Sequence, residues 1–278
     1  MQTPPEFAEY PRAKGQPSGV LAKPPGVYFE AINDGWALFA RAWPTWVAAQ
    51  LVVGFLAIAI YVPFGFLETY LEFGKLSLFP PGGSEPSPAW QLLSWTVDLL
   101  PGLVAAGLQA GMLSMAIRQV RGDRFGFGDA FCAFRHAPKL LLIGAVVSLP
   151  AAVFNAAFGT LVGFGATVGL SLLVSPLLAL APFIAVGQDL SGREAIALGV
   201  RALGGFVGWF RMLLLFIVMG LIYICGFVAC CVGVLAAGPI CVLIMAVHYY
   251  YFFPEVFQPA QPPFGQPLSA ETAPPVQG

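Results

Sequence analysis

A chain of 278 residues that is 58% hydrophobic and only 10% charged cannot cover a water-soluble surface, because soluble proteins carry about 25% charged residues. Its net charge of −1 argues against a nucleic-acid partner, since no basic face exists to neutralise phosphates. The composition therefore predicts an integral membrane protein whose main partner is the lipid bilayer.

Residues 1–25 contain no apolar segment typical of a signal peptide and are predicted to form a disordered tail. The stretch that follows, FEAINDGWALFARAW, places Phe29, Trp36 and Trp43 on one apolar stripe at helical spacing. We expect an amphipathic helix over 26–43 that lies in the membrane interface, with these three side chains as anchors.

Long stretches without a charged residue follow, at 42–67, 140–188 and 212–254, with a shorter one at 99–117. A membrane crossing needs about 20 residues, so the second and third of these stretches each hold two spans. The sequence predicts six spans, at about 46–67, 99–117, 140–160, 166–187, 212–230 and 234–253. The aromatic run HYYYFF closes the last span and is expected to lie at the lipid interface.

Two further segments resemble the first amphipathic one. Phe131 and Phe134 lie on an apolar stripe within 126–137. Val200 and Phe210 lie on the stripe of 191–210, where we expect a helix over 192–208 that begins at the capping box Ser191-x-x-Glu194. The fold class we predict is an all-α polytopic bundle of six transmembrane helices in three hairpin repeats, each preceded by a cytoplasmic interfacial helix. The repeats span about 26–117, 124–188 and 191–253; the alternative is three unrelated helices that precede spans.

Basic residues are distributed unevenly between the two sides of this topology. Twelve of the 13 lysines and arginines fall on the side of the two termini, and Lys75 alone lies opposite. The positive-inside rule therefore places both termini in the cytoplasm.

Four polar residues lie in or beside the predicted spans: Asp98, Gln50, Gln109 and Asn155. An acid inside a bilayer is a candidate functional group, but we expect Asp98 to lie at the interface in the first turn of its helix. The three amides are expected to form hydrogen bonds between helices, with substrate contact as the alternative.

Five cysteines and two histidines form no CxxC motif and no cluster with carboxylates, so neither a metal nor a cofactor site is expected. No spacing predicts a nucleophile with a base, and we expect no catalytic activity. The proline-rich segment 254–278 is predicted to be a disordered tail.

The segment SGREAIALGVRALGGFVGWFRMLLLFIVMGL, followed by ACCVGVLAAGPICVLIMAVHYYYF, resembles the last repeat of a broad group of bacterial six-span membrane proteins. That group includes the membrane domain attached to some glycerophosphodiester phosphodiesterases. The resemblance covers about 190–253 and extends in weaker form over 26–163. It implies a bacterial inner-membrane location and carries over no catalytic residue, because this chain has no phosphodiesterase domain.

Two functional hypotheses remain at this stage. The first is a structural, regulatory or partner-binding membrane protein. It would contact lipid, and other membrane proteins, through the three amphipathic helices on its cytoplasmic side. The second is a small transporter or channel with a path along the pseudo-symmetry axis of the repeats.

Overall fold

The computed structural model describes residues 25–73, 88–228 and 232–257, and within these ranges the protein is all-helical. The α-helices are α1 (Ala31–Phe73), α2 (Pro88–Arg121), α3 (Ala137–Leu178), α4 (Ala181–Gly187), α5 (Gly192–Ala202), α6 (Phe206–Val228) and α7 (Val232–Phe252). Three short 3-10 helices complete the fold: η1 (Phe127–Phe131), η2 (Phe134–His136) and η3 (Pro254–Phe257).

Five segments of the described helices are long and apolar enough to cross a membrane, which confirms the multi-pass class. They are Ala31–Leu67, Pro101–Arg121, Val168–Gly187, Phe206–Val228 and Gly233–Phe252. The predicted span at 140–160 is not among them. It falls in the first part of α3, where many side chains lie outside the described residues.

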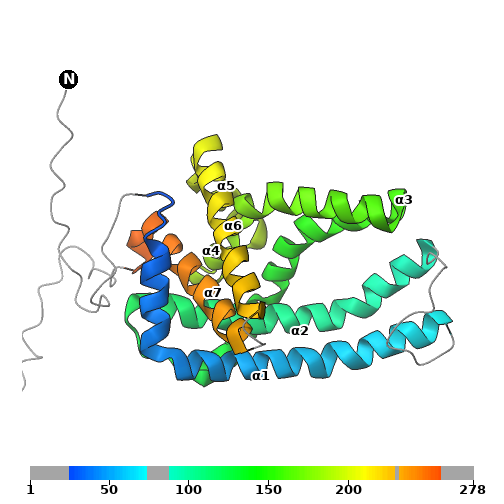
Figure 1. Ribbon diagram of the computed structural model, residues 1–278, viewed down its shortest axis with the longest axis horizontal. Helices are drawn as coiled ribbons and strands as arrows, with labels where there is room; N and C mark the ends of the chain where they lie inside the picture. The colour runs from blue at the N-terminus through cyan, green and yellow to red at the C-terminus, as the bar shows by residue number, and fades with distance from the viewer. Residues whose placement is uncertain (1–24, 74–87, 229–231, 258–278) are drawn as a thin grey trace, which may run out of the picture.

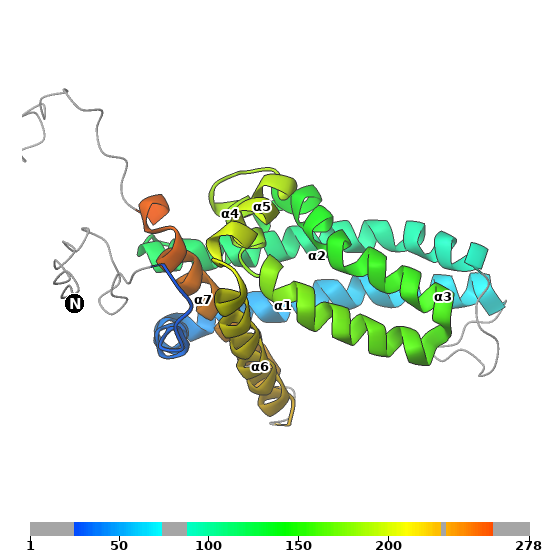
Figure 2. The same cartoon turned by 90° about the horizontal axis from the view of Figure 1, so that it is seen from above.

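The ribbon of α3 runs out to one end of the molecule and returns beside itself, so that its two limbs form a hairpin (Figures 1 and 2). These limbs, α2 and the long part of α1 run alongside one another, whereas α6 and α7 run across them. The last hairpin thus has a different inclination from the others, and the predicted threefold repeat is not confirmed.

The chain turns sharply at two places where an expected interfacial helix meets the following span. In α1 the backbone leaves helical geometry at Ala42 (φ −134°), two residues before Pro44, and the ribbon bends sharply there (Figure 1). Between α5 and α6 the chain turns at Gly204 and Gly205, whose φ values of +66° and +95° favour glycine. The first limb of α1 and helix α5 are therefore each separated by a turn from the helical segment that follows.

The helix predicted over 126–137 is wrong in type, because the segment forms the short helices η1 and η2. The Asp129 carboxylate accepts a hydrogen bond from the Gly126 backbone N–H (2.8 Å) and pairs with Arg118 of α2. This hydrogen bond and ion pair hold a tight turn against α2, and the turn leaves too few residues for a stable α-helix.

Gly107 and Gly111 allow this segment to approach α2 closely. A Cβ on Gly111 would lie 1.7 Å from the Ala130 carbonyl oxygen, and one on Gly107 would lie 2.4 Å from the Phe134 ring. Glycines at this small-xxx-small spacing usually mark the close approach of two membrane helices. In this protein the two glycines instead make room for η1 and η2 to pack against α2.

The aromatic run at the end of α7 is buried, so the prediction that it lies at the lipid interface is wrong. His248, Tyr249 and Tyr251 are each at most 1% exposed. The first limb of α1 covers this part of α7, and a Cβ on Gly35 would lie only 2.7 Å from Ile244 Cγ1. The aromatic side chains that resembled an interfacial belt in the sequence therefore form part of the core between helices.

Both ends of the described chain meet at one end of the molecule. The Tyr28 and Tyr251 rings are edge to face with centroids 5.6 Å apart, and Arg121 Nη2 donates to the Val256 carbonyl oxygen at 3.3 Å. Because Pro254–Phe257 forms η3, the predicted C-terminal tail cannot begin at 254. The start of α1, the end of α2 and the end of α7 thus share one face, which we call the terminal face.

Candidate functional site

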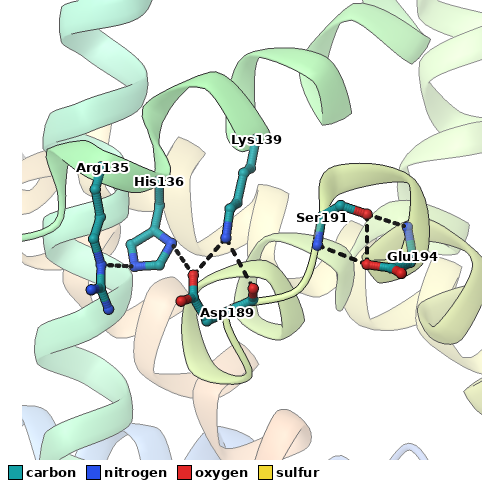
Figure 3. Close-up of polar contacts among 6 residues, drawn as sticks. All are labelled: Arg135, His136, Lys139, Asp189, Ser191 and Glu194. Atoms are coloured by element: carbon teal, nitrogen blue, oxygen red, sulfur yellow. Dashed lines mark hydrogen bonds and ion pairs between the residues drawn. The ribbon is translucent and has the colours of Figure 1, made fainter.

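A polar cluster joins the start of α3 to the connection between α4 and α5 (Figure 3). Lys139 Nζ donates to the Asp189 carboxylate at 2.5 Å and to the Asp189 carbonyl oxygen at 3.0 Å. Asp189 is the one non-glycine residue in the described chain with a positive φ (55°), a conformation that aspartate tolerates better than most residues. The hydrogen bond from Lys139 lowers the pKa of the Asp189 carboxyl.

His136 is buried beside this ion pair. Its Nε2 accepts a hydrogen bond from Arg135 Nε at 3.0 Å, and its Nδ1 lies 3.5 Å from Asp189 Oδ1. Burial and the charges of Lys139 and Arg135 lower the pKa of His136, so the imidazole is neutral at pH 7. With Nε2 occupied by Arg135, the imidazole does not face a nucleophile as it would in a catalytic triad.

Ser191 and Glu194 complete the cluster as the predicted capping box of α5, which is confirmed. The Glu194 backbone N–H donates to Ser191 Oγ at 3.4 Å, and the Ser191 backbone N–H donates to the Glu194 carboxylate at 3.1 Å. Hydrogen bonds from Ser191 lower the pKa of Glu194. The serine hydroxyl donates to the same carboxylate at 2.7 Å. Across elements, the pair of Lys139 and Asp189 fastens the start of α3 to the connection between α4 and α5.

The residues expected to be interfacial anchors are all exposed. Trp36 and Trp43 are 59% and 55% exposed on the first limb of α1. The remaining anchors are exposed on α1, η1, η2, α5 and α6: Phe29, Phe131, Phe134, Val200 and Phe210. Apolar side chains of this size on the surface of a membrane protein face lipid or a partner.

At the corner between α5 and α6, exposed apolar and basic side chains lie next to one another. Phe206 is 75% exposed, and its ring stacks on Trp209 (centroids 5.5 Å) and Phe210 (6.3 Å). Arg201 and Arg211, which precede and follow these rings in the sequence, are exposed, and neither has a carboxylate partner among the described residues. We call Val200, Arg201, Phe206, Val207, Phe210 and Arg211 the α5–α6 corner.

A cavity of about 220 Å³ lies between α1, α2, α6 and α7. Gln50 and Gln109, which the sequence identified separately, both line it, and Tyr223 adds a phenol. Its other lining side chains are apolar or glycine: Val53, Ala57, Ala105, Leu108, Met112, Gly238 and Val242. This mostly apolar lining with a few polar groups is typical of small-molecule sites, but the volume is below the roughly 300 to 1,000 Å³ of such sites and would hold only part of a larger ligand.

The other two polar candidates are not brought to this cavity. Asp98 lies in the interior of α2, which begins at Pro88, so the predicted position in a first helical turn is wrong. Its side chain and that of Asn155 in α3 lie outside the described residues.

Sequence reasoning missed Gln119, which is buried at the terminal face. Its amide oxygen accepts from Trp46 Nε1 and its amide nitrogen donates to the Leu38 carbonyl oxygen, both at 2.6 Å. Gln119 thereby joins α2 to α1 on both sides of the bend at Ala42. Gln119 lies beside Arg118 at the end of a predicted span, so nothing in the sequence distinguishes it from a solvated polar residue.

Comparisons with known proteins identified no relative: no family model, no curated protein and no solved structure matches the chain. Within the described residues, no group of three or more histidine, cysteine or acidic side chains is arranged to hold a metal ion. The resemblance of 190–253 to a bacterial six-span group therefore stays a prediction.

Proposed function

We propose that this chain is a non-catalytic, six-span protein of the bacterial inner membrane that binds anionic lipid headgroups, and through them partner proteins, at its α5–α6 corner. Two limbs of α3 in hairpin arrangement (Figures 1 and 2) support an even number of spans. The excess of basic residues on the side of the termini supports a cytoplasmic terminal face.

The observation that carries the proposal is the α5–α6 corner. The exposed rings of Phe206 and Phe210 would insert at the boundary between lipid headgroups and acyl chains. Their insertion would hold Arg201 and Arg211 at the level of the headgroups. Each arginine near an anionic membrane surface contributes about 1 kcal/mol of attraction. A zwitterionic lipid would give the same apolar contact without this gain.

The test is retention of phosphatidylglycerol by the purified chain, measured by native mass spectrometry against phosphatidylcholine. Arg201→Gln and Arg211→Gln should each lower the preference for phosphatidylglycerol about fivefold, which is the equivalent of 1 kcal/mol. Arg124→Gln is the matched control, because Arg124 is also exposed but lies outside the corner. Equal preference in all four proteins would contradict the proposal.

A small transporter or channel is the second candidate, and one observation favours it: Gln50 and Gln109 line the same cavity. A transport path requires water at that depth. In a variant without native cysteines, Gln109→Cys should then react with a water-soluble, membrane-impermeant maleimide. Absence of reaction would favour the binding role.

A further inference from the structure

We propose that the cavity between α1, α2, α6 and α7 is a binding site for a neutral lipid of the diacylglycerol type, with hydroxyl and ester carbonyl groups held by Gln50, Gln109 and Tyr223. The inference requires that the chain is embedded in a bilayer and does not depend on lipid binding at the α5–α6 corner.

The polar groups converge at Gly238. Gln50 Oε1 and the Tyr223 hydroxyl each lie 3.3 Å from the position that a Cβ would take on this glycine. The absence of a side chain at Gly238 therefore leaves both polar atoms accessible from the cavity, which lies between them and Gln109 of α2. Polar groups at this depth gain most when a ligand pairs with them, since the surrounding lipid offers few partners.

The lining selects for an uncharged ligand. No lysine, arginine, histidine or acidic residue lines the cavity, so a charged headgroup would enter without a counter-ion. The two amides both donate and accept hydrogen bonds, and the phenol does likewise. A ligand with one hydroxyl and two ester carbonyls pairs with both kinds of group, whereas a ligand that only accepts would leave the amide oxygens unpaired.

The position along α1 also fits a lipid. Gln50 follows Trp43 by seven residues, which is about 10 Å along a helix and less than half of a hydrocarbon core about 30 Å thick. Gln50, Val53 and Ala57 face the cavity, while Leu51 and Phe55 on the neighbouring face of α1 are exposed. Two acyl chains could leave the cavity along that apolar face and remain in the bilayer.

The experiment uses a photoactivatable diacylglycerol and the full chain in nanodiscs. We expect labelling of α1, α6 or α7, located by peptide mass spectrometry. Tyr223→Phe and Gln50→Leu should lower labelling about fivefold to tenfold, as expected when one hydrogen bond to the ligand is lost. Tyr61→Phe should leave it unchanged, because Tyr61 is exposed on α1 and does not line the cavity.

Photoactivatable quinone and phosphatidic acid are the competing probes. Stronger cavity labelling by either would overturn the choice of ligand, and equal labelling of wild type and both cavity variants would overturn the site. Melting temperatures within the range of wild type show that a loss of labelling does not come from unfolding. The arginine variants of the α5–α6 corner should label as wild type does, which separates this inference from the proposed function.

Discussion

At the scale of single residues, Gln119 shows how one buried amide joins two helices. It pairs with the Trp46 indole and the Leu38 carbonyl, so Gln119→Leu would leave both without their partner. We expect a loss of about 1 to 3 kcal/mol in the free energy of unfolding. Gln109→Leu makes the same change at an exposed position and should cost less than about 0.5 kcal/mol. Denaturation in mixed micelles measures both, and equal losses would contradict the assigned role.

His136 makes the stability of the folded protein depend on pH. Burial and two neighbouring cations lower its pKa in the folded protein, so the unfolded chain binds the extra proton more readily. The stabilisation is present above the ordinary histidine pKa of about 6.5 and is lost as pH falls below it. Wild type should therefore lose more stability than His136→Gln between pH 7 and pH 5, as measured by thermal unfolding at each pH. Parallel pH profiles would contradict this account.

At the scale of elements, the packing of the first limb of α1 on α7 requires a glycine. A methyl group at Gly35 would lie 2.7 Å from Ile244 Cγ1 and 3.0 Å from its backbone nitrogen. Gly35→Ala should cost about 1 to 3 kcal/mol, because α1 must move away from α7. At Gly54 a Cβ meets nothing within 4 Å, so Gly54→Ala should be neutral or slightly stabilising. Unfolding measurements in which both variants lose equal stability would refute the close approach.

The elements that follow from local chemistry were predictable. The capping box of α5, the bend before Pro44 and the turn at Gly204 and Gly205 each depend on residues within one or two helical turns. Features that depend on distant partners were not. The burial of Tyr249 and Tyr251 follows from the cover that α1 provides, more than 200 positions away in the sequence.

The candidate site likewise contains residues that the sequence could identify and residues that it could not. Gln50 and Gln109 could be identified because amides are rare in apolar spans. Tyr223 could not, since an aromatic residue in a span has the pattern of a packing residue, and only the tertiary structure brings it to Gly238. The prediction that Asp98 lies in a first helical turn was wrong because α2 begins ten residues before it, in a stretch that proline and serine made resemble a loop.

At the scale of the whole molecule, the contacts at the terminal face support the predicted topology. Asp34 accepts a hydrogen bond from the Tyr251 hydroxyl at 2.7 Å, and Lys139 pairs with Asp189 on the same side of the predicted topology. An odd number of crossings between Tyr28 and Tyr251 would place these residues on opposite sides of the bilayer. For the number of crossings to be even, α3 must contain two of six spans.

Single-cysteine labelling tests this requirement most directly. In a chain whose five native cysteines are replaced by alanine, Ser84→Cys and Ala270→Cys are treated with an impermeant maleimide in cells with a permeabilised outer barrier. Ser84→Cys should react from outside, and Ala270→Cys should react only after the inner membrane is disrupted, because the proposed topology places the terminal face in the cytoplasm. Reaction of Ala270→Cys in intact spheroplasts would place the C-terminus outside and contradict the six-span account.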